Sequence, residues 1–169
     1  GWLAETTAEG HSCAPMLWVP PARYSAGDTG GTANQVGGAE GYWEGASHAR
    51  VGRGWQQGAP AVACVRSWTV SQPGAIRIVG RVMKEYYHRN DGEPLRVRIL
   101  QGDTQVWPTQ DWAVVPVGDV SGVTHDFTLA VAPGDVIRFV LDKVTQPESA
   151  VLAWMPRIVY ADKETDGQA

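Results

Sequence analysis

The sequence contains no long apolar run and no excess of positive charge. It has 14 Lys and Arg against 18 Asp and Glu, which gives a formal net charge of -4. Binding to nucleic acid depends on a basic surface that neutralises phosphates, and a helix that crosses a bilayer needs about 20 predominantly apolar residues. Because the sequence supplies neither feature, we expect no nucleic-acid partner and no membrane partner.

Cysteine and histidine are scarce, which limits metal and catalytic chemistry. The two cysteines are Cys13 and Cys64, and the four histidines are scattered along the chain. Neither type has the close spacing of a zinc site, and there is no serine nucleophile elbow or glycine-rich phosphate loop. We therefore predict a protein without catalytic residues. The cysteines leave two alternatives open: a disulfide, worth about 3 to 4 kcal/mol in an oxidising compartment, or two buried free thiols.

Tryptophan and glycine, by contrast, are abundant, with 8 Trp and 20 Gly. Tryptophan is costly to expose and stacks well on flat apolar ligand faces, so its enrichment outside any helical pattern favours a binding surface. The chain begins at Gly1 without a methionine and ends in the polar stretch 161–169, which we interpret as a tail or linker. Such ends are typical of a processed secreted protein or of an excised domain.

Short strands dominate the predicted secondary structure. Residues 1–60 are rich in small residues and predict loops with short strands, whereas later runs of β-branched and aromatic residues are separated by turn formers. The predicted strands are Val62 to Val70, Ala75 to Lys84, Leu95 to Leu100, Gln105 to Trp107, Trp112 to Val117, Val123 to Val131, Val136 to Leu141 and Val151 to Tyr160. No helical spacing persists. The sequence therefore predicts one all-β domain over 1–160, an antiparallel β-sandwich of jelly-roll-like type.

Five segments after residue 60 carry a family resemblance. In order they are Val65-Arg66-Ser67-Trp68-Thr69, Pro73 to Gly80, Leu95 to Leu100 with Val106-Trp107-Pro108, Pro133 to Val140, and Trp154 to Tyr160. Together they resemble the carbohydrate-binding-module-like β-sandwich (jelly-roll) accessory domains of bacterial glycoside hydrolases and related polysaccharide-degrading proteins. The resemblance covers Gly54 to Tyr160.

The resemblance implies a secreted bacterial module that binds polysaccharide or oligosaccharide, has no catalytic residues and is covalently linked to a catalytic domain. It implies no required cofactor. Similar domains often carry an Asn/Asp-rich loop before the final tryptophan, whereas the loop from Lys143 to Ala150 holds few oxygen ligands for calcium. A structural calcium ion is left as an alternative, and no metal ligand is assigned.

One predicted loop, Glu85 to Gly92, concentrates aromatic and polar side chains. Proteins bind sugars by stacking aromatic faces on C–H groups and by hydrogen-bonding the hydroxyls with amide, carboxylate and guanidinium groups. The predicted carbohydrate-binding residues of this loop are Tyr86, Tyr87, His88, Arg89, Asn90 and Asp91. The alternative is a solvated loop whose tyrosines fold back onto the sheet edge.

Further aromatic residues are candidate stacking platforms. Tyr42, Trp43 and Trp55 lie in glycine-rich surroundings, and Trp112 follows a turn at the predicted rim. The alternative is that they plug the end of the sandwich, which is a common position for tryptophan in a small β domain. Trp68 and Trp154 lie within predicted strands, where we expect them in the core.

Outward-facing arginines suggest a contact for acidic glycans. Arg77, Arg96 and Arg98, together with Arg81 and Arg138, would form a ladder if their strands pair, and guanidinium groups bind carboxylates through two hydrogen bonds. The alternative is a solvated face on which these arginines pair with Asp126 and Glu93.

Two other functions remain open from the sequence. One is a structural or protein-interaction spacer, in which all the tryptophans are buried. The other is a jelly-roll polysaccharide lyase, because such enzymes use Tyr, His, Arg and Asn or Gln, and these residue types surround His88. Binding of carbohydrate is the function that the sequence favours.

Overall fold

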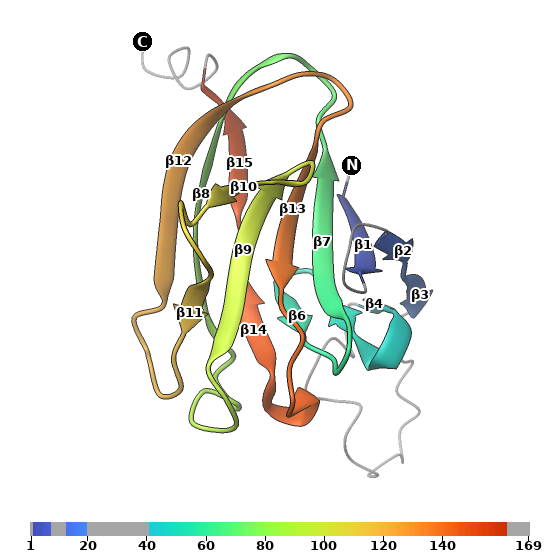
Figure 1. Cartoon of the computed structure of the whole chain (residues 1–169), viewed down its shortest axis with the longest axis vertical. Coiled ribbons are helices and arrows are strands. Elements are labelled where there is room, and N and C mark those ends of the chain that lie inside the picture. Colours follow the sequence, from blue (N-terminus) through green and yellow to red (C-terminus); the bar gives the residue numbers. More distant parts are fainter. Residues whose placement is uncertain (1, 8–12, 20–40, 162–169) are drawn as a thin grey trace, which may run out of the picture.

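The computed structural model describes residues 2–7, 13–19 and 41–161, which form two antiparallel sheets that face each other (Figure 1). The strands of the first sheet, sheet A, are β1 (Trp2–Thr7), β2 (Cys13–Pro15), β7 (Ala63–Thr69), β9 (Leu95–Gln101), β10 (Thr104–Trp107), β11 (Ala113–Val115) and β13 (Val136–Leu141). They run in the order β10-β9-β13-β7-β1-β2, and β11 also pairs with β9.

The second sheet, sheet B, packs behind sheet A in the view of Figure 1. Its strands are β3 (Leu17–Val19), β4 (Tyr42–Glu44), β5 (Arg50–Val51), β6 (Trp55–Gln57), β8 (Gly74–Lys84), β12 (Val123–Val131), β14 (Val151–Trp154) and β15 (Arg157–Tyr160). The order is β12-β8-β14-β6-β5-β4-β3, and β15 also pairs with β8. Two short 3-10 turns, η1 (Ala46–His48) and η2 (Pro147–Ser149), complete the described elements. The predicted all-β antiparallel sandwich is confirmed.

The strands agree closely with the pattern of the sequence. Those over Val123–Val131 and Val136–Leu141 have the predicted bounds, and several others differ by one residue at an end. The segment from Trp112 to Val117 is shorter than predicted, with β11 covering three residues. The last predicted strand is divided into β14 and β15 at Met155 and Pro156, because proline has no N–H to donate to a ladder.

The core lies between the sheets and is made by alternate residues of each strand. Ile76, Ile78 and Val82 of β8 point into it from sheet B, and Leu95, Val97 and Ile99 of β9 point into it from sheet A. Trp154 is fully buried and packs edge-on against Phe139, with ring centroids 5.4 Å apart. Trp68 is partly buried against the same core. The prediction that both tryptophans are core residues is confirmed.

Two polar side chains cross the core and join the sheets. Arg66 of β7 is buried and donates hydrogen bonds to the backbone carbonyls of Gly52, Trp55 and Trp154, all of which belong to the sheet B side. Burial lowers the pKa of Arg66 to about 10. In the opposite direction, the buried Gln56 of β6 donates to the carbonyls of Cys64 and Phe139 in sheet A. These bonds hold β6, and with it Trp55, in a fixed position relative to sheet A.

A histidine lies in the same core. His125 of β12 is buried, and its Nε2 accepts a hydrogen bond of 3.0 Å from the indole N–H of Trp154. A Cβ atom at Gly80, which pairs with His125 across the ladder, would lie 2.8 Å from the imidazole, so glycine is required there to make room for the ring. Burial lowers the pKa of His125 below its ordinary value. The ring therefore stays neutral in the folded protein at neutral pH.

The structure decides between the two alternatives for Cys64. Cys64 is a buried free thiol, and burial raises its pKa to about 12. On the backbone, β1 lies between β2, which carries Cys13, and β7, which carries Cys64. Two strand spacings separate the two backbones by about 10 Å, beyond the roughly 7 Å that a disulfide spans.

Candidate functional site

The loop between β8 and β9 carries two adjacent exposed tyrosines. Tyr86 and Tyr87 are 68% and 66% exposed, and their rings meet edge to face with centroids 5.4 Å apart. The guanidinium of Arg89 lies over the Tyr86 ring at 4.8 Å. The tyrosines do not fold back onto the sheet edge, so the aromatic surface faces solvent at the end of the sandwich where β9 begins (Figure 1).

This loop has a defined backbone structure. Turn hydrogen bonds run from the His88 N–H to the Glu85 carbonyl and from the Asp91 N–H to the His88 carbonyl. The Glu85 carboxylate accepts from the Tyr87 N–H at 2.9 Å, and the Arg89 carbonyl accepts from the Gly118 N–H in the neighbouring loop at 2.6 Å. The tyrosines therefore project from an anchored turn.

Lys84 anchors the loop from inside the sandwich. It is the last residue of β8, its side chain is buried, and its Nζ donates to the backbone carbonyls of Asp91 and Glu93. Burial lowers the pKa of Lys84, and the nearby charges of Asp91 and Glu93 oppose that shift. This role of Lys84 could not be predicted from the sequence, because the carbonyls that accept its hydrogen bonds lie seven and nine residues further along the chain.

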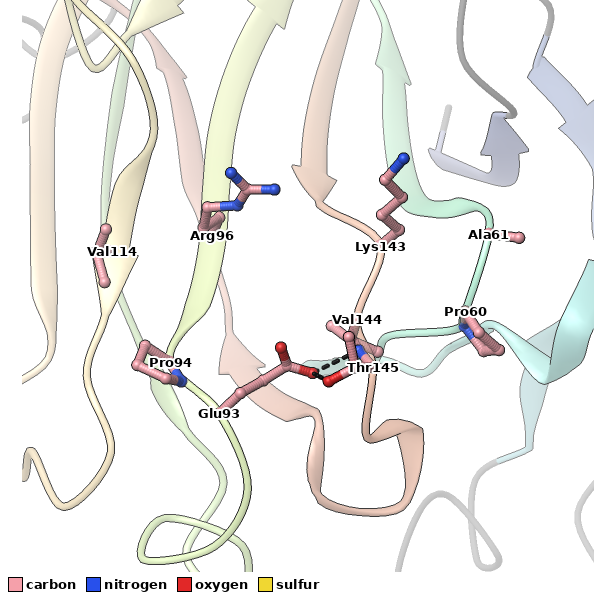
Figure 2. Close-up of a pocket in the computed structure, with 9 residues that line it drawn as sticks. All are labelled: Pro60, Ala61, Glu93, Pro94, Arg96, Val114, Lys143, Val144 and Thr145. Carbon is pink, nitrogen blue, oxygen red and sulfur yellow. Dashed lines mark hydrogen bonds between the residues drawn. The ribbon is translucent and has the colours of Figure 1, made fainter.

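Beside this loop, the end of sheet A forms a pocket of about 700 Å³ (Figure 2). The loop leads directly into Glu93 and Pro94, which line the pocket together with Val114 of β11, the strand paired with β9. Two cationic side chains, those of Arg96 and Lys143, border the pocket on one side in Figure 2. Pro60, Ala61, Val144 and Thr145 complete the lining.

The Glu93 side chain forms hydrogen bonds across this pocket to residues that follow β13. Its Oε1 accepts hydrogen bonds from the backbone N–H groups of Thr145 and Gln146 and, at 2.9 Å, from the Thr145 hydroxyl. Although burial opposes it, these donors lower the pKa of Glu93 below its ordinary value. The Glu93 carboxylate thus links the start of β9 to the segment that follows β13, as Figure 2 shows. It does not pair with the arginines, which was the alternative suggested by the sequence.

Next to the pocket, Trp112 lies between two arginines of β9. The guanidinium carbons of Arg98 and Arg96 lie 4.1 Å and 5.6 Å from the centroid of its ring. Arg96 also forms an ion pair with Asp142, which follows β13. Trp112 is half-buried, so it is a surface residue packed by cations and not a plug of the core.

The predicted ladder of five arginines is wrong, because its members belong to different sheets. Arg77 and Arg81 lie on β8 in sheet B, whereas Arg96, Arg98 and Arg138 lie on β9 and β13 in sheet A. Arg77 makes two 2.8 Å hydrogen bonds to Asp126, which is the pairing that the solvated-face alternative predicted. Arg96, Arg98 and Arg138 thus lie on sheet A, and Arg77 and Arg81 form a separate pair on sheet B.

The other predicted platform residues, Tyr42, Trp43 and Trp55, lie on β4 and β6 of sheet B. Trp43 faces the core and is partly buried, and its ring is 4.5 Å from that of Trp18. Tyr42 and Trp55 lie with centroids 6.0 Å apart, and Arg50 lies over the Tyr42 ring at 5.3 Å. Trp18 is 49% exposed and was not singled out from the sequence, since its surroundings show no strand periodicity. The structure thus does not bring these residues together with the Tyr86 loop.

The described residues were also compared with the patterns of metal sites and of membrane-spanning helices. Within residues 2–7, 13–19 and 41–161, no group of three or more His, Cys, Asp and Glu side chains is arranged to hold a metal ion. Over those same ranges, no helix is long and apolar enough to cross a membrane. That no cofactor is required stays a prediction to be tested, with a structural calcium ion as its alternative.

Comparison with known proteins gives weak structural likenesses. No protein-family model and no curated protein sequence matches the chain. Solved structures that resemble it include the C-terminal CBM6 of LamC, a marine laminarinase from Zobellia galactanivorans (TM-score 0.35, 13% identity, 94% of this chain and 99% of that chain). The CBM22-1 xylan-binding domain of Paenibacillus barcinonensis Xyn10C also resembles it (TM-score 0.38, 17% identity, 94% and 92%), as does rabbit GITRL (TM-score 0.36, 14% identity, 56% and 69%). At these TM-scores, the assignment of a β-sandwich rests on the strand pairing of this chain.

Proposed function

We propose that this chain is a non-catalytic carbohydrate-binding module of a secreted bacterial protein, which binds polysaccharide and targets a covalently attached enzyme to it. The observation that carries the proposal is the pair of exposed tyrosines on the anchored turn after β8. A single exposed aromatic side chain needs no explanation, but two adjacent rings that are each about two-thirds exposed present a continuous apolar surface to solvent.

The chemistry around the pair suits a sugar. Pyranose rings offer C–H groups that pack on aromatic faces and hydroxyls that need hydrogen-bond partners. Arg89 lies directly over Tyr86, and His88, Asn90 and Asp91 belong to the same turn. Because Lys84 and the Glu85 carboxylate fix the backbone, little conformational entropy is lost when a ligand binds. Attachment to an enzyme would raise that enzyme's local concentration on the polysaccharide even at modest affinity.

Removing both rings tests the proposal. In the double variant Tyr86→Ala/Tyr87→Ala we expect retention in polysaccharide affinity gels to fall by about tenfold or more, because each stacked ring contributes roughly 1 kcal/mol beyond its buried area. Met155→Ala is the matched control, since Met155 is 68% exposed but lies between β14 and β15. Equal retention by the double variant and the control, with both folded by circular dichroism, would show that the tyrosines do not bind sugar.

A further inference from the structure

The Trp112 cluster, beside β9 of sheet A, contains two arginines and one aspartate, so its own charge is positive. The cluster consists of Trp112, Arg96, Arg98 and Asp142. Asp142 pairs with Arg96, so the cluster holds two guanidinium groups and one carboxylate beside one indole ring. Glu93, the other nearby carboxylate, is already bound by Thr145 and Gln146. Among the described residues, none forms an ion pair with Arg98.

The orientation of Arg98 leaves part of its guanidinium available. Its guanidinium carbon lies over the Trp112 ring, 4.1 Å from the centroid, so the indole lies against one side of the group. Its Nε is buried without a hydrogen-bond partner, whereas neither terminal nitrogen is both buried and unpaired. The free edge of the guanidinium therefore reaches solvent, and this edge is the part that binds an anion.

We infer that the Trp112 cluster binds the carboxylate of a uronic acid residue in an acidic polysaccharide, with the sugar ring in the adjoining pocket. The inference rests on the proposed function and names its substrate class. Arg96 and Val114 line the pocket. Trp112 contacts Arg96 and lies two residues before Val114 in the chain. A sugar in the pocket would thus hold its carboxylate within reach of Arg98.

A planar carboxylate suits this site because of its shape. A guanidinium edge and a carboxylate lie in one plane and form two parallel N–H···O bonds, a geometry that remains available while Trp112 covers the guanidinium face. Arg98 is held in this position by the ring and by its place in the middle of β9, between β13 and β11. The site is therefore ordered before the ligand arrives. A sulfate ester is tetrahedral and makes less use of this planar arrangement.

The test compares two polysaccharides with the same backbone, polygalacturonate and its fully methyl-esterified form, by affinity electrophoresis and titration calorimetry. We expect the native chain to bind polygalacturonate at least about tenfold more tightly, and Arg98→Gln to remove most of that preference, because a charge-assisted hydrogen-bond pair is lost. Arg98→Lys should restore only part of it, since lysine keeps the charge but not the paired geometry. Added salt should weaken the preference.

Arg157→Gln is the matched control, because it removes the same charge from an exposed arginine of β15 in sheet B. Equal preference in the Arg98→Gln and Arg157→Gln variants overturns the inference. So does native binding of the esterified polymer alone, or of a sulfated galactan in preference to polygalacturonate, and in these cases the proposed function stands. Failure of the folded native chain to bind any polysaccharide overturns both.

Discussion

His125 is a buried ionisable side chain, so we expect it to make the free energy of unfolding depend on pH. Its Nε2 is occupied by the Trp154 indole N–H, and the surrounding side chains, Trp107, Phe127 and Trp154, are aromatic. A proton on this ring would place a charge among apolar groups and displace the hydrogen bond. The folded state therefore binds that proton less readily than the unfolded chain does.

The resulting pH dependence has a definite sign. Because the pKa of His125 is lowered on folding, the unfolded chain takes up the proton first as the pH falls. We expect the contribution of His125 to the free energy of unfolding to be complete above the ordinary histidine pKa of about 6.5. This contribution should decrease as the pH falls below that value. Urea unfolding of the native chain and of His125→Gln, measured at several pH values, tests this.

The glutamine side chain introduced by that substitution keeps an acceptor for the Trp154 N–H but cannot titrate. The native chain should lose stability between neutral and mildly acidic pH more steeply than His125→Gln. Parallel pH profiles for the two proteins would mean that His125 is not the group responsible.

At the scale of single residues, the sequence predicts faces well and partners poorly. Alternation along Leu95, Val97 and Ile99 is enough to place them inward, because a strand must bury one face. The burial of Lys84, Arg66 and His125 could not be predicted, since each depends on a carbonyl or indole supplied by another segment of the chain. Polar core residues interrupt the apolar pattern without indicating what satisfies them.

At the scale of elements, the loop from Glu85 to Gly92 depends on Lys84 for its shape. Replacing Lys84 by methionine keeps a side chain of similar length but leaves the carbonyls of Asp91 and Glu93 without their donor. We expect a loss of about 1 to 3 kcal/mol in the free energy of unfolding and faster amide hydrogen exchange in residues 85–93. Exchange in β12, which does not contact this lysine through a hydrogen bond, should change little.

Lys143→Met provides the comparison for this prediction. It makes the same chemical change at an exposed lysine outside the loop. If the loop amides exchange equally fast in both variants, Lys84 does not order the loop. If exchange of the loop amides becomes faster only in Lys84→Met, the buried Lys84 side chain orders the loop that carries Tyr86 and Tyr87.

The sequence did not show which strands pair with one another or which sheet each strand belongs to. The outward positions of Arg77 and Arg96 were predicted from period-two alternation, but their strands belong to different sheets. Alternation is a local property, whereas sheet membership depends on which strands meet after the chain has folded. The same limit explains why the sequence could not show whether the aromatic residues near Tyr42 and those near Tyr86 belong to one site.

At the scale of the whole molecule, polar side chains join the two sheets across the core. Arg66 and Gln56 join the sheets through backbone carbonyls, so the sandwich is a rigid support for its loops and faces. The Tyr86 loop and the pocket lie at the end of sheet A where β9 begins. A module with this arrangement would bind a polysaccharide chain along one end and one face, leaving the other sheet free to face an attached domain.

Direct binding of polysaccharide by the native chain is the measurement that tests this account most directly. Affinity gels containing neutral or uronate-rich polysaccharides should be run with calcium and with a chelator. We predict specific retention by at least one polysaccharide, and, since we expect no required calcium ion, we predict that the chelator does not reduce it. A folded chain that migrates freely through every gel would contradict the account and favour a structural spacer or a protein-interaction domain.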